Sequence, residues 1–427
     1  MMKQKPTSRN PWAWVPSLYI AEGIPYTMAM TVSVVLYKRL GISNTDIALY
    51  TSWLYLPWVI KPLWSPFVDL FRTKRYWILL MQLLIGVSIA CVAFTIPAGR
   101  FFQYTLAFFW LMAFSSATHD TAADGFYMLG LSEDFQAAYV GVRATFYRIA
   151  MIATQGGLVI FAGFLEGSGH DIPTTWSIAF FLAAGVSAGL FLYHYFILPY
   201  PATDHPASRT ASTSTFREFS HIFVLFFKKK GILTILAFFL FYRFAETQIV
   251  KIIAPFLLDP TSKGGLGLTT SEVGITYGTV GVISLLVGGL LGGYAIYRKG
   301  LKFWIWTMVC AVHLPDLVYV YLSQTMTDNI YLINLCVAVE QFGYGFGFTA
   351  YTMFMIMVSE GENKTVHYAI STGIMALGMM VPAMVSGWLQ EQLGYQHFFL
   401  WVMAATIPGF IVTGLVKIDP EFGKKKT

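Results

Sequence analysis

The chain has 427 residues, of which 56% are hydrophobic and 12% charged, and its formal net charge is +6. Ordinary soluble domains are about one quarter charged and less than half apolar, so this composition excludes a soluble globular protein. Apolar runs of about twenty residues recur along the chain, and each can cross a hydrocarbon core about 30 Å thick.

These runs predict twelve transmembrane helices. They lie at residues 12–37, 46–68, 76–97, 102–130, 140–165, 174–197, 231–258, 271–297, 301–322, 328–358, 364–390 and 395–416. The first run has no small-residue cleavage site after it, so we interpret it as a retained helix and not as a signal peptide. The three cysteines lie inside runs and form no metal or redox spacing, so neither a metal nor a cofactor is expected.

Basic residues mark one face of the predicted bundle. They cluster at residues 3–9, 72–75, 209–230, 298–302 and 417–426, whereas the loops of the other face contain only Lys38, Arg39, Arg100 and Lys263. Basic loops of membrane proteins stay in the cytoplasm, so both termini are predicted to be cytoplasmic in a bacterial inner membrane. The same rule accounts for the net charge without nucleic acid as a partner.

An internal repeat divides the chain into two halves. LGISNTDIA at residues 40–48 recurs as LGLTTSEVG at 266–274, and both have the S/T-x-x-D/E form of a helix capping box. The repeat predicts an N-terminal six-helix half (1–197), a cytoplasmic linker (198–230), a C-terminal six-helix half (231–416) and a cytoplasmic tail (417–427). The offset also places Asp69 on Ala295, so only the first half keeps the acid of that loop.

The stretch KPLWSPFVDLFRTKR, residues 61–75, resembles the loop signature of the major facilitator superfamily. Its Trp-Ser-Pro form, together with YIAEGIPY at 19–26 and ATHDTAADGFYML at 117–129, is similar to the muropeptide permeases of the AmpG type and to acetyl-coenzyme A transporters. The chain differs from that branch in His119, where Gln is usual, and in Glu22, where a neutral residue is common.

The resemblance implies an all-α membrane protein with twelve transmembrane helices in two pseudo-symmetric six-helix halves. It also implies that Asp69, Arg72 and Arg75 close an inner gate. The alternative for the basic residues is a positive-inside signal alone.

Acidic residues inside the predicted spans are candidates for proton coupling, because a charge within the bilayer usually has a partner or a function. Asp120 and Asp124 are four residues apart and share a helical face, so they could share a proton. The alternative is ion pairing with Arg143 or Arg148. Glu22 and Glu340, which lie near the middle of their spans, are further candidates.

Other polar residues within the spans are candidates for solute binding. Arg148, with Gln155 on its face, suits an anionic group of the solute. Arg243 and Glu246 could either bind the solute or form an internal ion pair. The remaining candidates are the aromatic residues Tyr19, Tyr26, Tyr127 and Tyr344 and the amide of Gln341.

The glycines of GYGFGF at 343–348 and the pairs Gly288/Gly292 and Gly289/Gly293 are interpreted as helix-packing contacts. His313 and Asp316 are interpreted as a polar pair at a local kink around Pro315 in a peripheral helix, and not as a proton relay.

The leading hypothesis is a monomeric secondary transporter, not an enzyme, that uses protons and alternating access to import a small-molecule solute containing an amino sugar, such as an anhydromuropeptide or related oligosaccharide. One alternative is efflux of amphipathic compounds. Another is a membrane acyltransferase or acetyl-coenzyme A-handling protein, with His119, Asp120 and Asp124 as its catalytic candidates.

Overall fold

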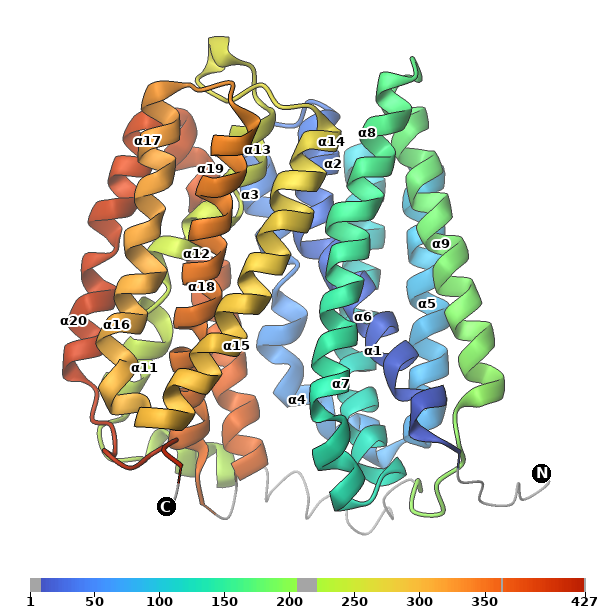
Figure 1. Cartoon of the computed structure of the whole chain (residues 1–427). Coiled ribbons are helices and arrows are strands. Elements are labelled where there is room, and N and C mark those ends of the chain that lie inside the picture. Colours follow the sequence, from blue (N-terminus) through green and yellow to red (C-terminus); the bar gives the residue numbers. More distant parts are fainter. Residues whose placement is uncertain (1–8, 206–220, 362–363, 426–427) are drawn as a thin grey trace. The chain divides into compact units, whose positions relative to one another are not determined.

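The computed structural model describes residues 9–205, 221–361 and 364–425, and these form helices joined by turns and short loops (Figure 1). Eight helical segments among them are long and apolar enough to cross a membrane: Pro11–Arg39, Lys74–Thr95, Gly141–Gly167, Ile172–Ile197, Ile232–Leu258, Thr270–Lys299, Leu301–Thr325 and Val366–Leu415. Helices cover all of the predicted ranges, so the all-α membrane fold is confirmed.

Some predicted spans differ in detail from uniform helices. The range 46–68 is divided into α3 (Asn44–Trp53) and α4 (Leu56–Leu70). The last two ranges join in α19 (Lys364–Ala405), which bends at Gly394, where φ is 70°, and α20 (Ile407–Leu415) follows. The repeated segments both begin helices: Thr269 and Glu272 form a complete capping box, whereas the Ser43 side chain accepts from the Asp46 N–H without the reciprocal bond.

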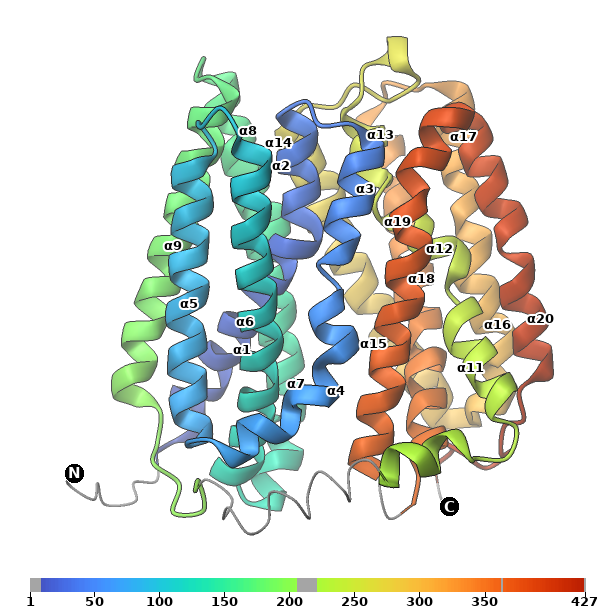
Figure 2. The same cartoon turned by 180° about the vertical axis from the view of Figure 1, so that it is seen from behind.

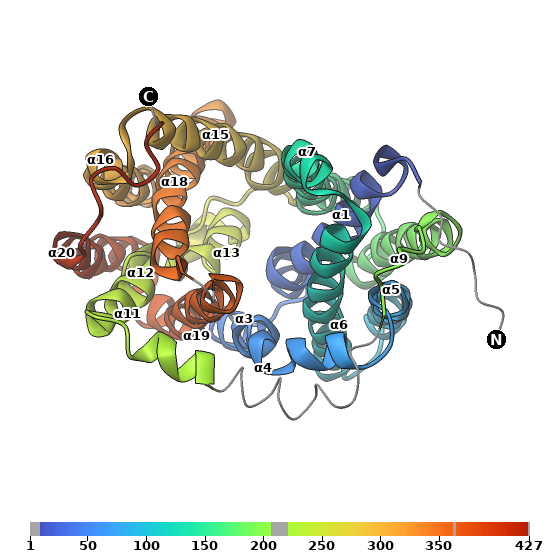
Figure 3. The ribbon, with the colours of Figure 1, turned by 90° about the horizontal axis from the view of Figure 1, so that it is seen from below.

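The contacts divide the chain into two compact units. The first unit contains the described residues of Met1–Ser33 and Ile60–Glu218. Its helices, besides most of α4, are η1 (Pro11–Ala13), α1 (Val15–Thr27), η2 (Met28–Val32), α5 (Lys74–Thr95), α6 (Phe101–Gly130), α7 (Glu133–Met151), η3 (Ile152–Leu158), α8 (Val159–Gly167) and α9 (Ile172–Ile197). Within it, α5 packs against α6 and α9, and α1 packs against α7 (Figure 3).

The second unit contains the described residues of Val34–Val59 and Phe219–Thr427. Its helices, besides α3, α19, α20 and nearly all of α2 (Ser33–Arg39), are α11 (Ile232–Phe241), α12 (Phe244–Val250), α13 (Ile253–Leu258), η4 (Thr261–Lys263), α14 (Thr270–Val273), η5 (Gly274–Gly281), α15 (Val282–Lys299), α16 (Leu301–His313), η6 (Leu314–Asp316), α17 (Leu317–Thr325) and α18 (Ile330–Ser359). Here α3 lies beside α19 (Figure 2).

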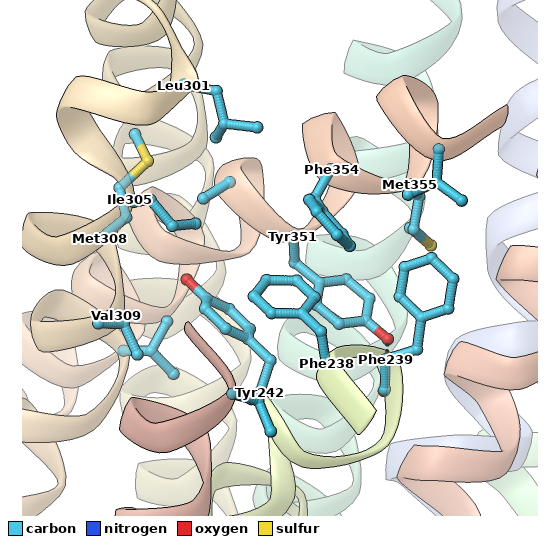
Figure 4. Close-up of a cluster of buried hydrophobic side chains, with 14 of the residues drawn as sticks. Phe238, Phe239, Tyr242, Leu301, Ile305, Met308, Val309, Tyr351, Phe354 and Met355 are labelled. Atoms are coloured by element: carbon cyan, nitrogen blue, oxygen red, sulfur yellow. Dashed lines mark hydrogen bonds between the residues drawn. The ribbon is translucent and has the colours of Figure 1, made fainter. Parts of the chain in front are cut away.

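An aromatic cluster forms the core of the second unit at one end of α11 and α18. The rings of Phe238 and Phe354 are 4.4 Å apart, and those of Tyr242 and Tyr351 are 5.5 Å apart (Figure 4). Both tyrosines are fully buried, and each hydroxyl donates to a backbone carbonyl, of Gly347 at 3.1 Å and of Phe239 at 2.7 Å. The cluster therefore buries large apolar area without leaving its polar atoms unsatisfied.

The glycines of α18 set its distance from two neighbours. A Cβ atom at Gly345 would lie 2.1 Å from the Leu285 carbonyl oxygen of α15, and one at Gly343 would lie 2.1 Å from the Ala311 oxygen of α16. A Cβ at Gly288 would meet the Phe342 oxygen at 2.1 Å. The packing role predicted for GYGFGF and for Gly288 is confirmed, whereas a Cβ at Gly293 would meet no atom within 4 Å, so the prediction is wrong there.

A polar network holds residues 34–59 within the second unit. The Lys38 ammonium donates to Asp259 at 2.6 Å and to the Asn44 side chain at 2.8 Å. Asp259 also accepts from Tyr395 at 2.6 Å, and Asn44 donates to Gln390 at 2.6 Å. The Lys38 and Asp259 side chains are only 13% and 9% exposed, so this is a buried ion pair, and the Lys38 ammonium and the Asp259 Oδ2 atom each have a further hydrogen-bond partner.

Replacing Lys38 by Met should destabilise the protein. Removal of one partner of a buried pair leaves the other charge unpaired and costs about 3–5 kcal/mol. The measurement is denaturant unfolding of the purified protein in detergent, with Lys263→Met as the control because Lys263 is exposed in the neighbouring η4. Equal losses from the two variants would contradict the importance of the pair.

Candidate functional site

Three carboxylates meet in the first unit. Glu22 comes from α1, and Asp120 and Asp124 come from successive turns of α6, which packs against α1. One oxygen from each of the three carboxylates lies within 4.8 Å of the other two. Asp120 and Asp124 were predicted to share a helical face. Glu22, about 100 residues earlier in the chain, lies beside them as a third acid.

Two of these acids have cationic partners. The Lys61 ammonium of α4 pairs with Asp120, and the Arg143 guanidinium of α7 pairs with Asp124 at 2.5 Å. Tyr19 donates to Asp124 at 3.1 Å, and its ring lies 4.5 Å from the Arg143 guanidinium. The pairing of an α6 acid with Arg143, which the sequence left open, is therefore present.

Glu22 differs from the other two acids. Its side chain is 9% exposed, and its Oε2 atom has no hydrogen-bond partner among the described residues. The cluster consequently contains three acids and two bases, and the acid without an ion-pair partner is the one in α1.

Arg148 lies between two residues of α7, Tyr147 and Ala150, that face Gly23 of α1 at close range. A Cβ at Gly23 would lie 2.8 Å from the Ala150 Cβ and 2.9 Å from the Tyr147 oxygen, so Glu22 and Arg148 belong to helices in direct contact. The polar contact of the Arg148 guanidinium is Met151 Sδ at 3.5 Å. No described acid lies within ion-pair distance of it, so Arg148 has no counter-ion among the described residues.

The other candidates of the first unit surround these groups. Tyr127 packs edge-on against Tyr19 with ring centroids 6.1 Å apart, and its hydroxyl donates to the Gln136 carbonyl. The ring of Tyr26 is 6.4 Å from that of Tyr147. Gln155 is buried in the π-helical segment η3 that follows Arg148. Tyr19 and Tyr127 therefore lie beside the acidic cluster. Tyr26 lies beside Tyr147, the residue before Arg148.

In the second unit, Arg243 is surrounded by partners. It lies at the interruption between α11 and α12 and bonds Glu246 at 2.9 Å and the Tyr344 hydroxyl at 2.8 Å. The rings of Tyr344 and Phe348 each lie 4.9 Å from its guanidinium. The Arg243 and Glu246 side chains are 4% and 3% exposed. In this structure they therefore form an internal ion pair, which was the alternative to solute binding.

Glu340 is held by neutral donors. Its Oε2 accepts from Tyr319 at 2.9 Å and from Gln341 at 3.0 Å, and the residue is 2% exposed. Gln341, expected to contact the solute, thus donates to its own neighbour in this structure.

The loop after α4 holds the predicted gate residues. Arg72 is exposed and adopts a left-handed backbone conformation with φ at 68°. Arg75 is buried and donates to the Tyr195 carbonyl at 2.5 Å and to the Leu198 carbonyl at 3.4 Å, at the end of α9. Asp69 is the last residue but one of α4, and its side chain lies outside the described residues. The gate role of all three stays a prediction.

A cavity of about 430 Å³ lies beside Arg75. It is lined by Thr73, Arg75, Tyr76, Leu79, Leu80, Leu83, Phe191, Tyr195, Tyr200, Pro201 and Asp204. None of these residues belongs to the acidic cluster, so the cavity does not mark a solute site there.

A model of the major facilitator superfamily matches residues 17–360. The chain belongs to this superfamily. It is 25% identical over 402 residues to the anhydromuropeptide permease of Escherichia coli K12, covering 92% of this chain and 77% of the relative. It is 23% identical over 409 residues to a putative transporter, AmpG 4, of Rickettsia conorii, covering 92% and 94%.

Solved structures of the same superfamily share the fold. A D-xylose–proton symporter aligns with a TM-score of 0.69 at 11% identity, covering 96% of this chain and 98% of that one. The nucleoside transporter NupG aligns with a TM-score of 0.66 at 15% identity, covering 95% and 98%. The chain is therefore a multi-pass membrane transporter for a small-molecule solute.

The facilitator site contains one residue that sequence reasoning missed. Lys61 lies within a predicted span, and a lysine at that depth is itself a signal of function. Lys61 is also the first residue of the loop signature, in which only Asp69, Arg72 and Arg75 were predicted to have a role. His119, a catalytic candidate of the acyltransferase alternative, is fully buried and bonds Gln82 at 3.0 Å.

Glu246→Gln should destabilise this transporter, because it leaves the Arg243 guanidinium buried without its anion, at a cost of about 3–5 kcal/mol. The double variant Arg243→Met with Glu246→Leu should recover much of the loss, since no charge then remains buried. Unfolding temperature is the measurement. Glu421→Gln is the matched control, because Glu421 and Lys424 have the same i,i+3 spacing but are 74% and 44% exposed. Equal shifts for the Glu421 and Glu246 variants would refute the expectation.

Proposed function

We propose that this facilitator is a proton-coupled importer of amino-sugar-containing solutes, an anhydromuropeptide or a related oligosaccharide, across a bacterial inner membrane. It works as a monomer by alternating access, with both termini in the cytoplasm. The relatives named as muropeptide permeases support the class of solute, and the loop charges of the sequence support the orientation. The observation that carries the proposal is the pair of uncompensated groups, Glu22 and Arg148, on two helices in contact.

Glu22 is the proposed proton carrier. With Lys61 on Asp120 and Arg143 on Asp124, the cluster is neutral when Glu22 carries a proton and has one excess negative charge when it does not. An excess charge is costly in the bilayer interior. Asp120 and Asp124 of α6 already have cationic partners, so they contribute to the electrostatic environment of Glu22. Glu22 is the acid that takes up the proton.

Arg148 is the proposed ligand for the anionic group of the solute. A guanidinium offers two parallel donors to a carboxylate, and that of Arg148 has no described acid to compete for them. Anhydromuropeptides carry carboxylates on their peptide part and sugar rings that suit aromatic side chains such as Tyr26. Arg243 has partners on all sides, so Arg148 is the stronger candidate.

The direct test is uptake of labelled N-acetylglucosaminyl-anhydro-N-acetylmuramyl peptide into vesicles that contain the purified protein. An inward proton gradient should drive accumulation, and a protonophore should abolish it. Accumulation driven by a sodium gradient at constant pH would refute proton coupling. Failure of the probe to bind or exchange would refute the solute class.

Glu22→Gln should separate coupling from movement of the solute. A permanently neutral side chain mimics the protonated carrier, so solute exchange between the two sides should persist, whereas accumulation against a gradient should be lost. Counterflow and gradient-driven uptake in the same vesicles measure the two activities. Glu421→Gln should retain both, and gradient-driven accumulation by the Glu22 variant would contradict the assignment.

Arg148→Gln should weaken binding of the anionic solute. A charge-assisted hydrogen bond contributes about 1.5–3 kcal/mol, which corresponds to a roughly 10- to 100-fold rise in Kd. Arg148→Lys should lose less, because it keeps the charge without the planar pair of donors. Calorimetric titration with the same probe measures Kd, and Arg100→Gln, at an exposed arginine, is the control. An unchanged Kd for the Gln variant would exclude Arg148 as the ligand.

A further inference from the structure

Asp316 is a buried acid whose carboxyl group has no partner. It ends η6, the short 3-10 segment around Pro315 that interrupts the helix between α16 and α17. The residue is 1% exposed, and neither of its carboxyl oxygens has a hydrogen-bond partner among the described residues. A kink alone would not require an acid, so the interpretation of this segment as a local kink is incomplete.

Glu340 of α18 lies close to this acid. The Tyr319 hydroxyl that bonds Glu340 at 2.9 Å comes from the residue three positions after Asp316, which places Asp316 and Tyr319 on one helical face. η6 is in contact with α18. Asp316 is nine residues before the end of α17, and Glu340 is ten residues after the start of α18, so both lie about 14–15 Å from the loop that joins these helices.

The polar residues nearest to Asp316 along its own helix, His313 and Tyr319, provide no positive charge. The His313 ring bonds the Tyr242 carbonyl at 3.0 Å through Nε2. That nitrogen therefore carries a proton. The buried Nδ1 has no hydrogen-bond partner among the described residues, so a cationic ring would leave a second N–H unsatisfied and the neutral tautomer is favoured. Tyr319 is a neutral donor to Glu340.

The other elements around η6 provide no free cation either. At the two ends of α12, Arg243 is paired with Glu246, and the Lys251 ammonium lies 5.4 Å from the Tyr55 ring. On α19, Tyr395 bonds Asp259 and His397 is exposed. Tyr277 of η5 is buried and uncharged. No described cation lies within ion-pair distance of Asp316 or Glu340.

We propose that Asp316 and Glu340 form a second proton-binding site of the transporter, in the second unit. An ionised carboxylate without a counter-ion is strongly disfavoured in the bilayer interior, whereas a carboxylic acid is neutral. Each group therefore binds one proton and becomes a neutral acid, and the site releases a proton when water reaches the interruption at η6. This inference deepens the proposed proton coupling and rests on it for the role of the site in the cycle.

Infrared difference spectroscopy of the purified protein in lipid tests the resident protons. The carbonyl stretch of protonated carboxylic acids should be present at neutral pH, and Asp316→Asn and Glu340→Gln should each remove part of it. Asp328→Asn is the control, because Asp328 is exposed in the loop between α17 and α18. Neutralising Asp316 should leave the unfolding temperature close to that of the parent, since its side chain is already neutral. Absence of the band, or a band that neither variant alters, would overturn the proposal.

Proton counting tests the role in transport. With the labelled anhydro-disaccharide peptide as probe and a pH-sensitive dye inside the vesicles, Asp316→Asn should move one proton fewer per solute than the parent. Equal ratios would overturn that role. If no protons enter with the solute in any variant while the infrared bands behave as expected, the proposed coupling fails and the second proton-binding site stands.

Discussion

An unpaired charge is strongly disfavoured in the interior of a bilayer, and this constraint governs where the polar side chains of the transporter lie. Arg243 and Glu246 pair three residues apart at the start of α12, whereas Lys38 with Asp259, Lys61 with Asp120, and Arg143 with Asp124 each join separate elements. These pairs hold the bundle in a defined register. Glu22, Arg148, Asp316 and Glu340 have no ion-pair partner among the described residues, and these are the groups proposed to bind a proton or the solute.

Interruptions of the regular α-helices lie at or near several of the charged residues, both paired and unpaired. Arg243 lies between α11 and α12, and Asp316 lies in the 3-10 segment at Pro315. Arg148 is followed by the π-helical segment Ile152–Leu158, and Glu22 precedes the π-helical segment Met28–Val32. Departures from regular α-helix are frequent at functional sites, and irregular backbone inside a membrane is tolerated where protein or a polar cavity surrounds it.

Much of this architecture could be predicted from the sequence, because hydropathy and helix length are local properties. The apolar runs located the helices, and the spacing of the glycines in GYGFGF indicated close packing that Gly343 and Gly345 show. The ion pairs could not be predicted in the same way. Lys61 and Asp120 are 59 residues apart, so only the packing of α4 near α6 brings them together. The unpartnered state of Asp316 could not be predicted either: its carboxyl group has no hydrogen-bond partner among the described residues, and no sequence pattern reveals the lack of a partner.

The packing of residues 34–59 within the second unit bears on how the transporter could change shape. The chain passes between the units after Ser33 and again after Val59. The first passage directly follows the π-helical segment Met28–Val32, and the second lies near the interruption at Leu54 and Tyr55 between α3 and α4. Hinges absorb backbone change at a few positions where regular structure ends. The Lys38 network joins the segment between these two passages to other parts of the second unit through Asp259 and Gln390. The network therefore holds residues 34–59 in the second unit, and the irregular turns at Met28–Val32 and at Leu54 and Tyr55 flank this segment.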